Sequence, residues 1–155
     1  TSGLVLFLQP PSGFSHWSPS FLIVDDVTYG DTEQCLMTEN ARQYSDSNAQ
    51  REIVRTDYPR FQRRLGRSVG FDTAVWDTHR DHIACRENYA NCSHCPDMLS
   101  QLLVTSDRTL AEVSQRYTLW GIGRRADHAD AQHPSLWRGQ NYLHTGLQRV
   151  RSLLP

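Results

Sequence analysis

The sequence contains no lysine, since all 16 of its basic residues are arginine. The 17 acidic residues leave a formal net charge of -1, so overall charge provides no reason to bind nucleic acid or a membrane surface. No apolar run is long enough to span a bilayer. The run Leu4 to Leu8 is too short for the apolar core of a signal peptide, and prolines follow it at once. We therefore expect a cytoplasmic protein without a membrane partner.

The composition that is present fits a globular domain. The chain has 155 residues, of which 38% are hydrophobic and 21% charged. A chain of this size is large enough to bury a core of its own. Internal repeats, low-complexity runs and linkers are missing from the sequence. These features predict a single domain over residues 1–155 that is a monomer.

The first third of the chain carries strand signals. Leu4 to Leu8 reads as a short buried strand. Two further apolar stretches, 21–24 and 27–29, flank Asp25-Asp26, which is typical of a tight hairpin. The sequence therefore predicts one small antiparallel sheet near the N-terminus.

Helix signals dominate the rest of the chain. Asp31 and Thr32 are expected to cap a helix that continues to about Tyr44 and carries Glu33 in its first turn. Further helices are predicted from Asp46 to Arg55, Pro59 to Gly66, Asp72 to about Tyr89, Pro96 to Leu103, Leu110 to Val113 after a cap at Asp107, and Gln140 to Leu153. Together these elements predict a helix-rich α+β fold.

The stretch from Trp120 to Asn141 contains two tryptophan–glycine clusters on either side of a polar loop. The first reads Trp120-Gly121-Ile122-Gly123 and the second Trp137-Arg138-Gly139-Gln140-Asn141. Glycine lets the backbone approach a ligand, tryptophan offers a flat face for a base, and arginine grips phosphate with two hydrogen bonds. The pattern suits a nucleotide-like ligand; the alternative is an ordinary loop closed by the start of a helix.

Two closely spaced pairs, His82 with Cys85 and Cys92 with Cys95, raise the question of a metal. Four such ligands can hold tetrahedral zinc, and a disulfide between Cys92 and Cys95 is a second alternative. The third interpretation places His82 and Cys85 on a helix that faces the core. We favour the third and expect neither a metal nor a cofactor.

Eight short motifs, in one collinear order, resemble the NADAR family. They are Phe14 to Phe21 (F-S-x-W-x-P-S-F), Asp25 to Tyr29, Thr32 to Arg42, Arg64 to Arg67, Phe71 to Trp76, Thr105 to Arg108, Trp120 to Gly123, and Trp137 to Leu143. The resemblance covers nearly the whole chain and implies the fold of that family.

The resemblance also implies an activity. Members of the family are N-glycoside hydrolases that break a bond between a ribose C1′ and a nitrogen. Some remove ADP-ribose from guanine in nucleic acid, and others cleave phosphorylated intermediates of riboflavin synthesis. The first substrate is the preferred expectation here, so the expected ligands are ADP-ribose or a ribosyl phosphate, and ADP-ribosylated nucleic acid.

Glu33 matches the family glutamate and is the expected catalytic carboxylate. A carboxylate beside C1′ stabilises the positive charge that builds on the sugar and can activate water. Glu39 lies six positions further along the same helix, and this spacing places the two acids on different faces. A structural explanation for Glu33 also exists, because the helix dipole favours an acid in a first turn.

The chain departs from the family pattern at residues near the expected site. Asn40 stands where family members usually carry lysine, and Tyr117 stands where they often carry aspartate. Lysine can form a Schiff base with an opened sugar or steady the substrate's charge, and asparagine does neither. These changes motivate an alternative function, a module that binds ADP-ribose without cleaving it.

The remaining site predictions also follow the resemblance. Trp76 is expected to stack on a base or ring, although its spacing also suits core packing. Arg80 is a weaker phosphate candidate than Arg138, because a surface role suits it better. The residues expected to bind substrate are Phe14, Ser15, Glu39, Trp76, Trp120, Gly121, Gly123, Arg138, Gly139 and Asn141.

Overall fold

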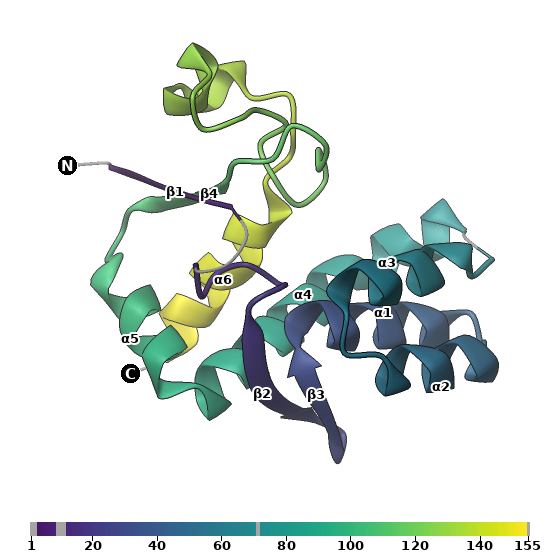
Figure 1. Ribbon diagram of the computed structural model, residues 1–155. Helices are drawn as coiled ribbons and strands as arrows, with labels where there is room; N and C mark the ends of the chain where they lie inside the picture. The colour runs from purple at the N-terminus through teal and green to yellow at the C-terminus, as the bar shows by residue number, and fades with distance from the viewer. Residues whose placement is uncertain (1–2, 9–11, 71, 155) are drawn as a thin grey trace. The chain divides into compact units, whose positions relative to one another are not determined.

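The structure is a computed structural model that describes residues 3–8, 12–70 and 72–154. The chain divides into two compact units (Figure 1). Unit 1 joins Thr1–Ser15 to Asp97–Pro155, and unit 2 is the continuous segment His16–Pro96. Among the described residues, no helix is both long and apolar enough to cross a membrane.

Unit 2 begins with the predicted hairpin. Strand β2 (Pro19–Val24) pairs antiparallel with β3 (Val27–Asp31). Asp25 and Asp26 form the turn with φ angles of 50° and 63°, a left-handed conformation that aspartate tolerates better than most residues. The two-residue turn confirms the hairpin prediction.

Four helices complete unit 2: α1 (Thr32–Gln43), α2 (Ser47–Arg55), α3 (Pro59–Ser68) and α4 (Thr73–His94). The predicted caps are present, since Asp31 accepts from the backbone N–H of Gln34 and Asp46 from that of Ala49. Helix α1 is buried around its whole circumference from Thr32 to Ala41, and is therefore the central helix of this unit.

The end of α4 differs from the prediction. The helix was expected to stop near Tyr89 but continues to His94. Ala90, Asn91 and Cys92 are buried, so tertiary packing extends the helix beyond the point where the apolar sequence pattern weakens.

Unit 1 contains a second sheet that the sequence did not predict. Strand β1 (Leu4–Phe7) pairs in parallel with β4 (Thr109–Glu112), with Leu4 opposite Thr109. The prediction of a helical turn over Leu110 to Val113 was wrong. The backbone N–H of Val113 donates to Phe7 at 2.8 Å, so pairing with a distant strand decides the conformation of this segment.

The rest of unit 1 consists of α5 (Pro96–Val104), the short 3₁₀ turns η1 (Ala129–Gln132) and η2 (Pro134–Leu136), and α6 (Tyr142–Leu153). Helix α6 begins two residues later than predicted, after Asn141 in a left-handed conformation. Its buried side chains include Leu143, Leu147 and Val150, the predicted apolar face. Both units mix helices with a small sheet, which confirms the helix-rich α+β fold.

Candidate active site

Glu33 lies in the first turn of α1 and its side chain is completely buried. Its carboxylate accepts two hydrogen bonds from Arg63 of α3, from Nε to Oε1 and from Nη2 to Oε2, both 2.8 Å long. Such a two-pronged pair fixes the plane of the carboxylate. Glu33 is therefore held in one orientation by a neighbouring helix, a fact that its place in the sequence does not reveal.

An aromatic ring supports Arg63 on its other side. The guanidinium carbon lies 5.2 Å from the centre of the Trp17 ring, within the range of a cation–π contact. Sequence analysis assigned neither residue to the site. Trp17 does lie in the first family motif, and Arg63 directly precedes the fourth, so these motifs were the available signals.

His16 contacts the first turn of α1, which carries Glu33. Its backbone carbonyl accepts from the N–H of Glu33 at 3.0 Å. Burial lowers the pKa of His16 to about 4; nearby Glu33 acts to raise that pKa and Arg63 to lower it further. The imidazole is therefore neutral near pH 7.

Asn40 shares a helix face with Glu33, because the two residues are two turns apart on α1. Its amide nitrogen donates to the carbonyl of Gly66 on α3 at 2.9 Å. Gly66 has no side chain to hold Met37 away, and a Cβ built there would lie 2.9 Å from the Met37 Cβ. The position of the family lysine thus belongs to the α1–α3 contact that also carries Glu33 and Arg63.

Glu39 has a different partner. It is buried and forms an ion pair of 3.1 Å with Arg42, which also contacts Asp25 of the hairpin turn. Glu33 instead pairs with α3. Trp76 is buried in the first turn of α4, and Arg80 forms an ion pair with Asp77 at 2.6 Å.

The remaining candidate residues belong to unit 1. Phe14 packs its ring edge-on against Phe7 at 5.5 Å between ring centres, and Ser15 is also buried. Asn141 is buried, where its amide donates to the carbonyl of Leu110 at 2.8 Å and accepts from the N–H of Glu112. Asn141 therefore fastens the start of α6 to β4.

The two tryptophan–glycine clusters meet in the structure. The carbonyl of Ile122 accepts from the N–H groups of Arg138 and Gly139, at 3.1 and 2.8 Å. A Cβ on Gly139 would lie 2.7 Å from the carbonyl carbon of Ile122, so only glycine permits this approach. Gly121 is equally close-packed, and Gly123 adopts a φ of +68°. The glycines thus bring two backbone segments together, and Trp120 lies partly exposed beside them.

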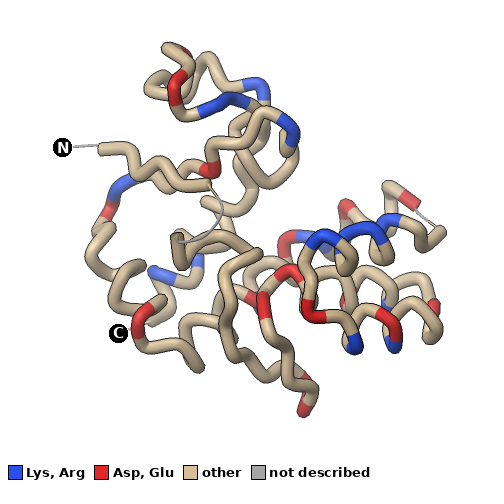
Figure 2. The backbone as a smooth tube through the Cα atoms, in the orientation of Figure 1, with Lys and Arg blue, Asp and Glu red and all other residues tan. Residues whose placement is uncertain are grey.

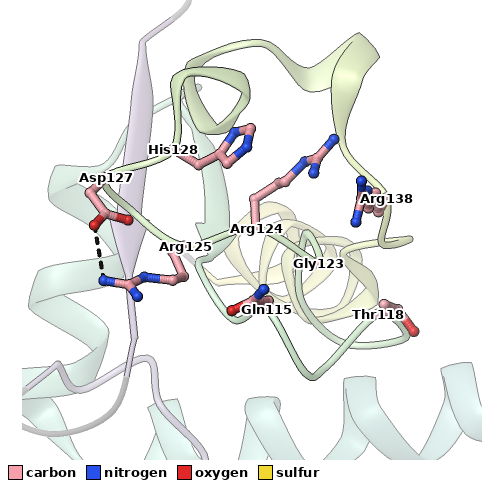
Figure 3. A pocket seen from close by; sticks show the side chains of 8 residues that line it. All are labelled: Gln115, Thr118, Gly123, Arg124, Arg125, Asp127, His128 and Arg138. Atoms are coloured by element: carbon pink, nitrogen blue, oxygen red, sulfur yellow. Dashed lines mark hydrogen bonds and ion pairs between the residues drawn. The ribbon is translucent and has the colours of Figure 1, made fainter.

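A pocket of about 420 Å³ opens beside this junction (Figure 3). Its lining residues are Gln115, Thr118, Gly123, Arg124, Arg125, Asp127, His128 and Arg138. Arg138 and Gly123 were predicted to bind substrate, whereas Arg124, Arg125 and His128 were not. The basic residues of the loop and those along α3 are both visible in Figure 2.

No group of three or more metal-ligating side chains comes together within the described residues. Cys92 is buried near the end of α4, whereas His82 is exposed on the same helix, so the interpretation that His82 faces the core was wrong. All four cysteines are free thiols. The zinc and disulfide alternatives therefore receive no support from the geometry.

Comparisons with known proteins agree over almost the whole chain. The profile of the NADAR domain family matches residues 6–155. The chain is 30% identical over 144 residues to N-glycosidase R617 of Acanthamoeba polyphaga mimivirus, covering 89% of this chain and 85% of that protein. Among solved structures, it resembles the Escherichia coli protein YbiA, with a TM-score of 0.78, 20% identity, and coverage of 98% of this chain and 84% of YbiA.

Proposed function

Because this chain belongs to the NADAR domain family, we propose that it is an N-glycosidase whose substrate is ADP-ribose attached to guanine in nucleic acid. Family membership and the N-glycosidase relative support a glycosidase-type function. The guanine-linked substrate is the finer part of the proposal, and it comes from the family resemblance of the motifs.

One observation carries the proposal: the buried carboxylate of Glu33 is held in a single orientation by Arg63. In the reaction, the C1′–N bond breaks, its electron pair leaves with the base, and the oxygen of water bonds to C1′. A fixed carboxylate beside C1′ stabilises the cationic sugar at the transition state without having to reorganise. Each oxygen of Glu33 keeps a second lone pair beside its bond to Arg63, so the carboxylate can take the proton of the attacking water, and the departing base nitrogen takes up a proton in turn.

Within unit 1, the loop is proposed to bind a nucleotide-like group by itself. Arg138 lines the pocket, and Gly121, Gly123 and Gly139 shape the backbone next to it. Trp120 offers a partly exposed ring. Phe14 and Asn141 are engaged in packing and in backbone bonds, so their proposed role is to hold these segments in place.

Asn40 favours the second candidate, a module that binds ADP-ribose without cleaving it. Its amide is committed to the Gly66 carbonyl and cannot act as the amine that the family uses.

The deciding measurement is release of ADP-ribose from a guanine-modified oligonucleotide, followed by chromatography. We expect slow release by the wild type, and at least about a hundredfold loss in Glu33→Gln, the typical size of an electrostatic contribution to catalysis. Asn40→Lys should accelerate release about tenfold, which corresponds to roughly 1.4 kcal/mol of barrier. Glu52→Gln, which changes an exposed acid on α2, is the matched control.

A binding measurement and a double variant distinguish loss of catalysis from loss of binding or of folding. Calorimetry with ADP-ribose shows whether Glu33→Gln still binds ligand, and the double variant Glu33→Gln with Arg63→Met removes the unpaired buried cation if the single variant is unstable. Unchanged hydrolysis in Glu33→Gln would contradict the proposal. Binding without hydrolysis in both the wild type and Asn40→Lys would establish the binding module instead.

A further inference from the structure

We propose that the pocket beside the junction of the two tryptophan–glycine clusters is a diphosphate-binding site in which Arg124 and Arg138 hold the anion. We call it the arginine pocket, defined by the eight lining residues given above. The inference concerns unit 1 alone and adds Arg124 to the residues that family motifs identify.

The charges around the pocket do not cancel. Three arginines line it against a single acid, Asp127. That acid pairs with Arg125 at 2.9 Å in a solvent-exposed position, so this pair contributes no net charge. Arg124 pairs with Asp130, which lies outside the lining, so the positive charge of the hollow that no acid among the described residues balances is that of Arg138.

Arg124 and Arg138 nevertheless both have donors that are not used within the described residues. Arg124 is 14% exposed and pairs with Asp130 at 2.7 Å through Nη2, while its buried Nε has no hydrogen-bond partner within the part of the chain described here. The guanidinium of Arg138 forms no ion pair with any acid among the described residues. A buried donor without an acceptor is costly, and an anion in the pocket would satisfy it.

The backbone fixes where these two side chains start. The backbone N–H of Arg138 donates to the carbonyl of Ile122 at 3.1 Å. Gly123 precedes Arg124, and a Cβ built on Gly123 would lie only 3.0 Å from the Cβ of Arg138, so the two segments pack closely. Figure 3 shows the Arg124 and Arg138 side chains, from two different segments, reaching toward the same space. Gln115 and Thr118 add neutral hydrogen-bonding groups to the wall.

This arrangement indicates the chemistry of the ligand. Two guanidinium groups, each able to donate two parallel hydrogen bonds, match the oxygens of a diphosphate better than a single carboxylate. A volume of about 420 Å³ is in the range of small-molecule sites and suits a diphosphate with part of its organic carrier. The choice of ADP-ribose as that carrier rests on the proposed function, whereas binding of inorganic pyrophosphate does not.

The test is calorimetry of the intact chain with inorganic pyrophosphate, ADP-ribose, adenosine and citrate. The wild type should bind pyrophosphate and ADP-ribose, and the double variant Arg124→Gln with Arg138→Gln should bind both at least about tenfold more weakly, equivalent to roughly 1.4 kcal/mol. Arg149→Gln, which removes an exposed arginine from α6, should bind as the wild type does.

A second variant guards against a folding defect in the first. Asp130→Asn removes the partner of Arg124 but keeps both arginines, so pyrophosphate binding should be retained or strengthened. Unchanged binding in the double arginine variant, equal loss in Arg149→Gln, or citrate binding as tight as pyrophosphate would overturn the inference.

The same data separate this inference from the proposed function. If Glu33→Gln binds pyrophosphate normally and neither it nor the wild type releases ADP-ribose from guanine, the hydrolase proposal fails and the arginine pocket stands. If release is normal while the double arginine variant binds and reacts as the wild type does, the arginine pocket fails and the hydrolase stands.

Discussion

At the scale of single residues, unit 2 is unusual because it buries acidic side chains in its interior. Glu33 and Glu87 are almost fully inaccessible to solvent. Glu33 has an arginine partner, which offsets much of the cost of removing its charge from water. Glu87 is different, because neither of its carboxyl oxygens has a hydrogen-bond partner within the described residues.

Replacing Glu87 with glutamine should stabilise the protein at pH 7. Burial raises the pKa of Glu87 well above its ordinary value, and Glu39 and Glu33 raise it further. A carboxyl with a raised pKa contributes most to stability below its unfolded pKa and loses that contribution as pH rises. We expect Glu87→Gln to gain about 1 to 3 kcal/mol at pH 7, because the neutral amide folds without the proton uptake that the buried carboxyl requires.

Urea unfolding at pH 7 and at pH 4 measures this effect. The gain should shrink at pH 4, where the glutamate is protonated in both the folded and the unfolded chain. Glu39→Gln is the comparison, because Glu39 has Arg42 as its ion-pair partner and its removal should destabilise. A loss of stability in Glu87→Gln at pH 7 would show that Glu87 has a stabilising partner.

At the scale of elements, the contact between α1 and α3 sets the candidate active site. Arg63 and Gly66 are one turn apart on α3, and they meet Glu33 and Asn40 on one face of α1. The helices can approach closely because Gly66 has no side chain where Met37 packs.

Gly66→Ala should therefore destabilise the protein. Alanine favours a helix over glycine by up to about 1 kcal/mol, but its Cβ would lie 2.9 Å from the Met37 Cβ, which belongs to the stem of that side chain. Overpacking of this kind costs about 1 to 3 kcal/mol and outweighs the helix preference. Thermal unfolding should show a lower Tm than in the wild type.

Gly70→Ala is the matched control for this change. A Cβ at Gly70 would meet nothing within 4 Å, so its Tm should stay near that of the wild type. Met37→Ala combined with Gly66→Ala should recover part of the loss, because alanine removes the Met37 Cγ and Sδ, which a Cβ at position 66 would also meet. Equal Tm values for Gly66→Ala and Gly70→Ala would show that the helices adjust without cost.

At the scale of the whole molecule, family resemblance extends over both compact units. The matched residues 6–155 include β2, β3, β4, the helices α1 to α6 and the second half of β1. The single domain expected from chain length stays a prediction. Each unit has a small sheet of two strands, so burial against helices supplies most of the stability of both.

The stability of the whole chain should fall on acidification through the titration of His16. Burial depresses its pKa from 6.5 to about 4, with Glu33 and Arg63 as its charged neighbours. A histidine with a depressed pKa favours the folded state fully above the unfolded pKa, and this contribution is lost as pH falls from 6.5 toward 4. The loss amounts to roughly 3 kcal/mol.

Urea unfolding between pH 7 and pH 4 tests this expectation against His16→Gln. The variant cannot be protonated, so its stability should fall less over this range than that of the wild type. Asp31 acts in the opposite direction, because burial raises its pKa to about 6 and its contribution grows as pH falls. A variant that follows the wild-type profile would show that His16 remains accessible to protons in the folded chain.

Local signals in the sequence determined much of the fold. Asp31 and Asp46 cap their helices because each side chain accepts a hydrogen bond from the backbone N–H three residues onward. Asp25 and Asp26 make the hairpin because both tolerate a positive φ. Such effects operate over a few residues, so the sequence alone predicts them. The family motifs can likewise be identified from the sequence alone.

Tertiary structure decided what depends on residues far apart in the chain. Segment 109–112 is a strand only because β1 lies beside it. Glu33 finds Arg63, and the carbonyl of Ile122 finds Arg138 and Gly139, through contacts between segments that the sequence does not place together. Periodicity and capping describe one element at a time, whereas the partner of a buried charge or carbonyl is chosen by how the elements pack.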